Sequence, residues 1–310
     1  MFAIPEGETM KSTHLAAALA LGMSGTAQAN IDIQFDFTYD IGSFFASADR
    51  QAALNAAASV FETRFADTLS AIVSSGSNSF DTVFFNPSNP NTNITLDSAS
   101  IAADVVRVYV GATNLGGSTL GVGGPGGFQC SGLGSFCADA SNRGEGDISG
   151  NDAVDFAPWG GAMSFNSTIS WHFGLTPTGL ESGESDFYSV ALHELAHVLG
   201  FGTSDSFDRY VDGSFYGPAA MAVHGGAVPM ANDGAHWFDG TRSVVNGVSQ
   251  EAAMDPTIRF GTRKNFTDLD YAAMRDVGWE VTPVPEAETW AMMLAGLGLV
   301  GVAAARRRSR

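Results

Sequence analysis

The sequence is poor in basic residues and in cysteine, and each scarcity excludes a class of protein. It has 15 Lys and Arg against 33 Asp and Glu, which gives a formal net charge of −18 at pH 7. Nucleic acids and anionic membrane surfaces repel so acidic a chain, so we expect neither as a partner. With two cysteines, the chain has too few for a disulfide-rich scaffold or a zinc site built from thiolates. It also lacks an internal repeat, which excludes a solenoid.

Long apolar runs are scarce too, and the first of them lies near the start of the chain. Residues 10–29 carry Lys11, a short apolar core and the small residues Ala27-Gln28-Ala29, which is the pattern of a secretory signal peptide. The stretch before Met10 includes two glutamates, the wrong charge for such a start, so we expect translation to begin at Met10. Removal of residues 1–29 by a signal peptidase would leave a mature chain beginning near Asn30; the alternative is an N-terminal core helix.

The second apolar run lies at the far end. Residues 289–305 are uncharged and are followed directly by three arginines, a pattern that favours a short transmembrane segment with a cytoplasmic end. Just before the run stands Val284-Pro285-Glu286-Ala287. Residues 283–310 therefore resemble the PEP-CTERM sorting signal of Gram-negative bacteria, with alanine in place of the second proline. The resemblance implies transient membrane anchoring, processing by an exosortase and delivery to the cell surface, outer envelope or extracellular polymer matrix; the alternative is a permanent membrane anchor.

Between these ends, residues 30–282 are long enough for one domain with a large core, in lobes of about residues 30–200 and 201–282. Alternating apolar residues predict strands, and Ala- and Leu-rich stretches without Pro or Gly predict helices. We expect strands over Ile31–Phe37, Asp104–Val110 and Ala162–Phe173, helices over Asp49–Val73 and Phe266–Trp279, and loops over Ser74–Asn93 and Gly111–Gly127. The Gly-rich loop lacks the Lys-Ser/Thr ending of a phosphate-binding loop, so we expect a flexible surface segment.

Two further features concern cross-links and cations. Cys130 and Cys137 are the only cysteines, and in an exported protein such a pair predicts a disulfide; the alternative is a pair of buried free thiols. Asp139–Asp155 is rich in carboxylates among Gly, Ser and Asn. Oxygen-rich loops of this kind can bind Ca²⁺, but no EF-hand spacing is present and a solvated acidic loop is the alternative.

The residues that carry chemistry are His193, Glu194 and His197, which form the pattern H-E-x-x-H. Positions i and i+4 of a helix lie on one face, so both imidazoles can bind one Zn²⁺ ion. Glu194 can then reach a water molecule on that ion and act as general base. Apolar neighbours predict the helix, and Gly200 predicts its end. The alternative is a buried helix with two incidental histidines, but a glutamate buried between them without an ion would be costly.

The longer run from His193 to Thr203, H-E-L-A-H-V-L-G-F-G-T, resembles the metzincin signature H-E-x-x-H-x-x-G-x-x-H. It matches at both histidines, at the glutamate and at the glycine, but Thr203 stands where the family has its third zinc ligand. Since catalytic zinc needs three protein ligands, the third must come from elsewhere. The candidates are Asp205, His224, His236 and Glu251.

Leishmanolysin-like metzincins delay their third histidine through an insertion, and His236 resembles that delayed ligand. His224 lies in a Gly-rich surface context, and Glu251 lacks the helical N-E-x-x-x-D run of glutamate-type zincins. In zincins an edge strand runs beside the active-site helix, and Phe156–Phe173 is our candidate by analogy. We expect His172 within it to be a packed strand residue rather than a ligand.

Ala253-Met254-Asp255-Pro256 resembles the Met-turn, which places a methionine beneath the ligands; the alternative is an ordinary core methionine. Together the resemblances imply an α+β metzincin-like fold, with a twisted N-terminal sheet, two long helices and an irregular C-terminal lobe with a terminal helix. They imply a secreted zinc endopeptidase acting on proteins or peptides, with His193, His197 and His236 as ligands and Glu194 as base. The alternatives are a surface or matrix protein with non-catalytic zinc and an adhesin.

Overall fold

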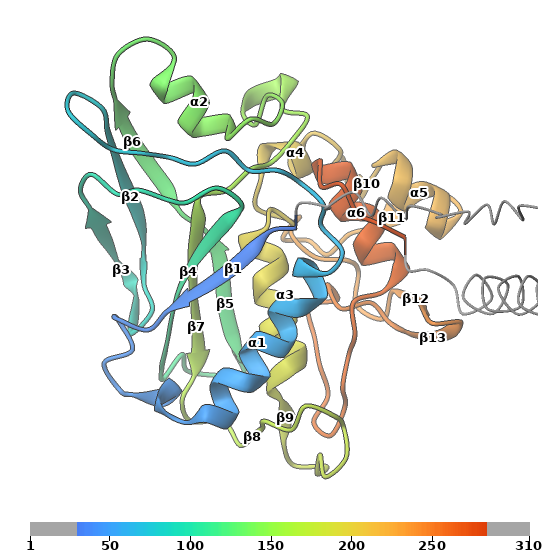
Figure 1. Cartoon of the computed structure of the whole chain (residues 1–310). Helices are drawn as coiled ribbons and strands as arrows, with labels where there is room; N and C mark the ends of the chain where they lie inside the picture. The colour runs from blue at the N-terminus through green and yellow to red at the C-terminus, as the bar shows by residue number, and fades with distance from the viewer. Residues whose placement is uncertain (1–29, 284–310) are drawn as a thin grey trace, which may run out of the picture.

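The computed structural model describes residues 30–283, and its fold is built on a four-stranded sheet (Figure 1). The strand order is β1 (Asp32–Asp36), β4 (Val105–Thr113), β7 (Gly160–Asn166) and β5 (Gly121–Pro125). The first three strands are parallel, and β5 runs antiparallel to β7 at the edge. The predicted strands over Ile31–Phe37 and Asp104–Val110 are confirmed, and the α+β class with them.

Strand β4 is buried on both faces, which explains its nearly continuous apolar sequence. Val106, Val108 and Val110 join a core cluster with the helices, whereas Val105 and Tyr109 join a second cluster on the opposite face. A central strand covered on both sides in this way fixes the position of its neighbour β7. Helices cover one face of the sheet and a smaller sheet covers the other (Figure 1).

The two long helices are α1 (Ala48–Glu62) and α3 (Phe187–Val198), which pack against each other on the helical face of the sheet. Helix α1 was predicted to reach Val73, and that boundary is wrong. After Glu62 the backbone leaves the helix to pair with the end of the described chain: Phe65 forms a bridge with Val281, and the Ala66 amide donates to the Glu280 carbonyl at 3.0 Å. A tertiary partner more than 200 residues away therefore ends this helix.

The smaller sheet contains β3 (Asn89–Leu96), β2 (Ser79–Asn86) and β6 (Gly127–Ser131) in that order. The predicted loop over Ser74–Asn93 is therefore wrong, because it contains most of a hairpin. Phe80 and Phe84 point inward at alternate positions of β2 and supply the buried face. Pro87 falls in the turn, and Pro90 lies in the edge strand β3, where a missing N–H is tolerated.

Helix α2 (Phe136–Asn142) is joined to β6 by the Cys130–Cys137 disulfide, with Cα atoms 5.7 Å apart. The predicted cross-link is thus confirmed. The remaining elements before Gly200 are short: η1 (Phe44–Ala46), η2 (Gly150–Asp152), β8 (Trp171–His172) and β9 (Ser185–Asp186).

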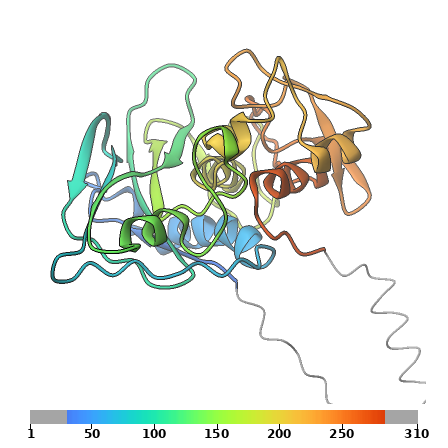
Figure 2. The ribbon, with the colours of Figure 1, turned by 90° about the horizontal axis from the view of Figure 1, so that it is seen from above.

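Beyond Gly200 the chain forms a lobe of short elements that lies on the other side of α3 from the sheets (Figure 2). They are α4 (Asp205–Asp208), β10 (Ser214–Phe215), α5 (Pro218–His224), β11 (Val228–Pro229), β12 (Arg242–Val245), β13 (Val248–Glu251) and α6 (Asp268–Val277). Helix α6 confirms the predicted terminal helix: Thr267 and Asp270 form its capping box, and Gly278 ends it.

One hydrophobic core crosses the boundary between the two lobes. The rings of Phe65 and Trp279 stack at 4.9 Å, and those of Phe61 and Phe266 meet edge to face at 5.0 Å. Polar contacts also hold the two lobes together at this boundary. Arg64 Nε donates to the Thr282 carbonyl at 2.6 Å, and the Thr282 amide donates to the Arg64 carbonyl at 2.8 Å. The described chain is therefore held in place up to its last residues.

The predicted signal peptide (1–29) and apolar run (289–305) lie outside the described residues. Within residues 30–283, none of the helices has the length and apolar character needed to cross a bilayer.

Arg143 is the most unusual buried residue of the N-terminal lobe. Its side chain is fully buried, and its guanidinium donates to four backbone carbonyls at 2.8–3.0 Å. These belong to Ser70, Ala102, Val105 and Pro158. Burial lowers the pKa of Arg143 to about 10, so it is still charged at neutral pH. The arginine thus joins the irregular segments beside β4 and β7.

We expect Arg143→Met to lower the free energy of unfolding by roughly 3 kcal/mol, because methionine keeps the length of the side chain but leaves buried carbonyls unpaired. The matched control is Arg242→Met, which removes an exposed arginine from β12 and should cost less than about 0.5 kcal/mol. Urea denaturation at constant zinc concentration measures both. Equal midpoints for the two variants would contradict the structural role of Arg143.

Candidate metal centre

Helix α3 carries the H-E-x-x-H residues and is anchored at both ends. At its start, Asp186 is the N-cap: its carboxylate accepts the Ser189 amide at 3.1 Å and pairs with Arg263 at 2.6 Å. At its end, Gly200 has a φ of +103°, as its predicted role requires. The Phe201 amide returns to the Ala196 carbonyl at 2.9 Å, which is a Schellman closure. This turn directs the Phe201 backbone back toward the helix.

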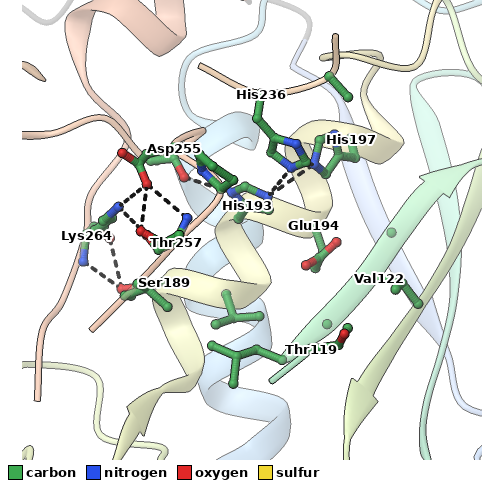
Figure 3. A pocket seen from close by; sticks show the side chains of 18 of the residues that line it. Thr119, Val122, Ser189, His193, Glu194, His197, His236, Asp255, Thr257 and Lys264 are labelled. Atoms are coloured by element: carbon green, nitrogen blue, oxygen red, sulfur yellow. Dashed lines mark hydrogen bonds and ion pairs between the residues drawn. The ribbon is translucent and has the colours of Figure 1, made fainter. Parts of the chain in front are cut away.

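The structure brings His193, His197 and His236 together (Figure 3). Each pair of Nε2 atoms is 3.1 Å apart, so the three nitrogens form a nearly equilateral triangle. Two of these side chains lie one helical turn apart on α3, and the third comes from the segment before β12, 39 residues after His197. His197 is buried, and the other two are partly exposed toward a cavity.

The other three candidates for the third ligand lie elsewhere. Asp205 accepts the Gly150 amide at the start of α4, and His224 is exposed at the end of α5. Glu251 pairs with Lys264 at 3.2 Å. His172 also lies outside the cluster, with its Nε2 3.1 Å from the Thr176 carbonyl, which agrees with its predicted role as a strand residue.

The hydrogen bonds at the other ring nitrogens determine where the protons are. Nδ1 of His193 lies 2.8 Å from the Ala253 carbonyl, and Nδ1 of His197 lies 2.8 Å from the Phe201 carbonyl. A carbonyl only accepts, so each Nδ1 must carry the hydrogen and each Nε2 of a neutral ring must carry a lone pair. Burial, together with the neighbouring histidines, lowers the pKa of His193 well below its usual value and that of His197 to about 4.

His236 follows the same rule with a carboxylate partner. Its Nδ1 lies 2.8 Å from Asp233 Oδ2, and the backbone and His236 hydrogen bonds hold the pKa of Asp233 below its usual value despite its partial burial. Asp233 was not among the predicted site residues; the available sign was its position three residues before a candidate ligand. A carboxylate on the far nitrogen of a ligand histidine orients the ring and makes it more basic.

In their neutral forms the three rings therefore direct Nε2 lone pairs at one another across 3.1 Å. Such an arrangement is repulsive unless a cation lies among the nitrogens, and neutral imidazoles are the ligands that zinc accepts at about 2.0–2.1 Å. The donor set fits Zn²⁺, with three protein ligands and room for one more on the cavity side. Zinc binding at this cluster remains a prediction that the geometry favours.

Glu194 lies beside the cluster and is only 6% exposed. Burial raises the pKa of its carboxyl group to about 8, and the Gly123 amide offsets part of that rise. A Cβ on Gly121 would lie 2.8 Å from Glu194 Oε1, and one on Gly123 would lie 2.5 Å from the Glu194 carbonyl oxygen. Only glycine at these positions lets β5 approach α3 so closely.

This arrangement corrects two expectations. Gly111–Gly127 was predicted to be a flexible surface loop, but it contains β5, the edge strand beside α3. The strand predicted for that role, within Phe156–Phe173, is β7, which lies between β4 and β5 in the sheet. The error arose because glycine is rare in strands, whereas here it is required by the close approach to Glu194.

A cavity of about 610 Å³ opens in front of the histidines. Strand β5 forms one wall, α3 the back, and residues 253–258 the opposite wall (Figure 3). Thr203, in place of the metzincin histidine, lines the cavity and donates its hydroxyl to the His197 carbonyl at 2.6 Å. On the side of residues 253–258, the Lys264 ammonium pairs with Asp255 at 3.3 Å and with Glu251.

Met254 lies in a tight turn beside the cluster; its assignment as a Met-turn stays a prediction. The Asp255 amide donates to the Ala252 carbonyl at 3.3 Å, and Met254 is fully buried. The neighbouring Ala253 carbonyl is the acceptor for His193 Nδ1. The turn thus orients one histidine through its backbone rather than through the methionine.

A second cluster of carboxylates contains Asp67, Glu145 and Asp155, with one oxygen of each within 4.8 Å of the others. Two of them belong to the segment predicted to bind Ca²⁺, whereas Asp67 follows α1 and was not identified. Burial raises the pKa of Asp67 to about 6 and that of Glu145 to about 7. Repulsion from neighbouring carboxylates adds to both rises, and backbone hydrogen bonds offset part of the rise at Asp67. Calcium binding remains a prediction for this segment.

Zinc content tests the ligand set directly. We expect roughly one zinc per chain in the purified protein and in His224→Ala, and loss of that zinc in His236→Ala, because catalytic zinc requires three protein ligands. Metal analysis after dialysis in zinc-containing buffer measures the ratio. Zinc retained in His236→Ala but lost in His224→Ala would place the third ligand elsewhere.

The carboxylate cluster gives a prediction for pH. Because the folded-state pKa values of Asp67 and Glu145 are raised, the native state binds more protons than the unfolded state between about pH 4 and pH 7, and stability falls as pH rises through that range. We expect Asp67→Asn to reduce this fall, whereas Asp152→Asn, at an exposed position of the same segment, should leave it unchanged. Unfolding free energies at pH 5 and pH 8, without added calcium, measure it. An equally steep fall in Asp67→Asn would refute the explanation.

Comparison with known proteins bears on the C-terminal end of the chain. Residues 283–308 match the PEP-CTERM protein-sorting motif, which confirms the motif predicted from this region despite Ala287. The motif indicates an exported protein of Gram-negative bacteria that is sorted to the cell envelope or surface, and it implies processing by an exosortase. No curated protein and no solved structure matches the chain.

Proposed function

We propose that this exported protein is a zinc-dependent endopeptidase of the metzincin type. The observation that carries the proposal is the triangle of Nε2 atoms at 3.1 Å with a buried glutamate beside it. His193, His197 and His236 would hold the ion. The metzincin assignment rests on the late third histidine and on the turn at Met254.

When bound, zinc supplies Lewis-acid chemistry, polarising a water molecule and the peptide carbonyl. Glu194 follows the first ligand in the chain and faces the same cavity. Its role would be to accept the proton of the attacking water and to return it to the leaving amine. A carboxyl group buried beside the cluster and facing the cavity is placed to exchange that proton, which is what a general acid–base requires.

Strand β5 suggests how a substrate would bind. It is hydrogen-bonded to β7 along one edge, and among the described residues no strand pairs with its other edge. An extended peptide can add to such an edge through its backbone. Gly121 and Gly123 contribute no side chains, so backbone pairing would dominate along this wall and Val122 would supply the apolar contact (Figure 3).

A surface protein with non-catalytic zinc is the competing function. A structural site is closed by a fourth protein ligand, whereas an open fourth position is the mark of catalytic zinc. The described cluster contains three ligand side chains, and Glu194 is separate from them. This arrangement favours catalysis.

The decisive variant is Glu194→Gln, which keeps the shape of the side chain but removes the base. We expect cleavage of an unfolded protein substrate to fall by roughly 10²–10⁴-fold, while zinc content stays at the level of the parent. Glu184→Gln, at a distance from the cluster, is the matched control and should retain full activity. A zinc-loaded parent that cleaves no peptide or unfolded protein would establish the non-catalytic alternative.

A further inference from the structure

Asp270 is a fully buried carboxylate on α6, and all of its partners are donors from other parts of the protein or from its own capping box. Oδ1 accepts Trp237 Nε1 at 2.9 Å and the Met254 amide at 3.3 Å. Oδ2 accepts the Ala253 amide at 2.8 Å and the amide and hydroxyl of Thr267 at 2.8 Å and 2.7 Å. A carboxylate accepts at both oxygens, whereas the amide of Asn, which has the same size, would place donors among these donors.

One of these contacts leads directly to His193. The Met254 N–H and the Ala253 C=O belong to the same peptide unit, so Asp270 binds one end of it while the other end accepts His193 Nδ1 at 2.8 Å. The hydrogen bond from the Met254 amide to Asp270 polarises this peptide and makes its carbonyl a stronger acceptor. The orientation of the His193 ring is thereby fixed by a residue on a different helix.

A second contact leads to His236. Its neighbour Trp237 donates its indole N–H to Asp270, and the Trp237 backbone amide donates to the Met254 carbonyl at 3.0 Å. Trp237 is fully buried, so the backbone on the C-terminal side of His236 is fixed in direction. The same carboxylate therefore holds the supports of two of the three candidate ligands, which come from segments 43 residues apart.

We propose that Asp270 is a positioning residue of the metal centre, which sets the relative placement of His193 and His236 and so raises the affinity for zinc. This inference rests on the proposed zinc site, although not on catalysis. Helix α6 contributes no side chain to the cluster, but in this role it would help to assemble the cluster.

A second buried aspartate on the same helix provides the control. Asp276 is 8% exposed, and its carboxylate accepts the Ala219 and Ala220 amides at 2.8 Å each. It therefore ties α6 to α5 much as Asp270 ties α6 to the turn at Met254, but none of its partners adjoins His193, His197 or His236. Asp276→Asn and Asp270→Asn each alter one buried carboxylate of α6, and only the second alters supports of the histidines.

The experiment measures the zinc dissociation constant of the full chain by competition with a chromogenic chelator, together with the visible spectrum of the Co²⁺ form. We expect Asp270→Asn to bind zinc at least about tenfold more weakly, the lower end of the effect of residues that orient metal ligands, and to shift the Co²⁺ spectrum. Asp276→Asn should stay within about twofold of the parent and keep its spectrum. Trp237→Phe, which removes one donor to Asp270, should weaken zinc binding in the same direction by a smaller factor.

Equal zinc affinity in Asp270→Asn and Asp276→Asn overturns this inference and leaves the proposed function standing, because the parent still binds zinc. A parent that binds no zinc overturns both. Where Asp270→Asn does not fold, Trp237→Phe decides: unchanged zinc affinity and an unchanged Co²⁺ spectrum in that variant overturn the inference.

Discussion

The structure depends on the direction of three imidazole rings. Each ring is held through Nδ1 by an acceptor at 2.8 Å, two of them backbone carbonyls and one a carboxylate. As a result, each Nε2 presents a lone pair to the other two. The surrounding architecture supplies these acceptors: the turn after α3 provides the Phe201 carbonyl, the turn at Met254 provides the Ala253 carbonyl, and the segment before β12 provides Asp233. The geometry of the candidate metal centre therefore depends as much on backbone turns as on the histidines themselves.

The pair of histidines on α3 could be predicted from the sequence because their relative position depends only on the geometry of one helix. His193 and His197 lie one helical turn apart, and a spacing of four residues is enough to place them on one face. His236 was identified through resemblance to a family, with its aromatic neighbour Trp237 as a secondary sign. Nothing in the residues between His197 and His236 specifies that the chain returns to the cluster, since that return depends on tertiary contacts such as those of Trp237 with Phe201 and Phe215.

The errors in the predicted fold have the same origin. The hairpin β2–β3 was hidden because its buried face is supplied by a few aromatic residues, Phe80 and Phe84 among them, within a polar Ser- and Asn-rich sequence. The end of α1 is decided by pairing with Val281, a partner that no local window contains. Strand β5 was misassigned because its glycines weaken it as a strand while making the contact with Glu194 possible. At β5, the need for close contact with α3 outweighs the low strand propensity of glycine.

The pairing of Arg64 with Thr282 has a mechanical consequence. The sorting motif begins at residue 283, immediately after the pair of reciprocal hydrogen bonds that closes the described chain. Tension applied through the C-terminal end would enter the protein at this clamp and at the bridge between Phe65 and Val281. From there it would pass to the end of α1 and the stacked rings of Phe65 and Trp279. Trp279 also donates its indole N–H to the Leu199 carbonyl at the C-terminal end of α3 at 2.7 Å, so the same path reaches the helix that carries His193 and His197.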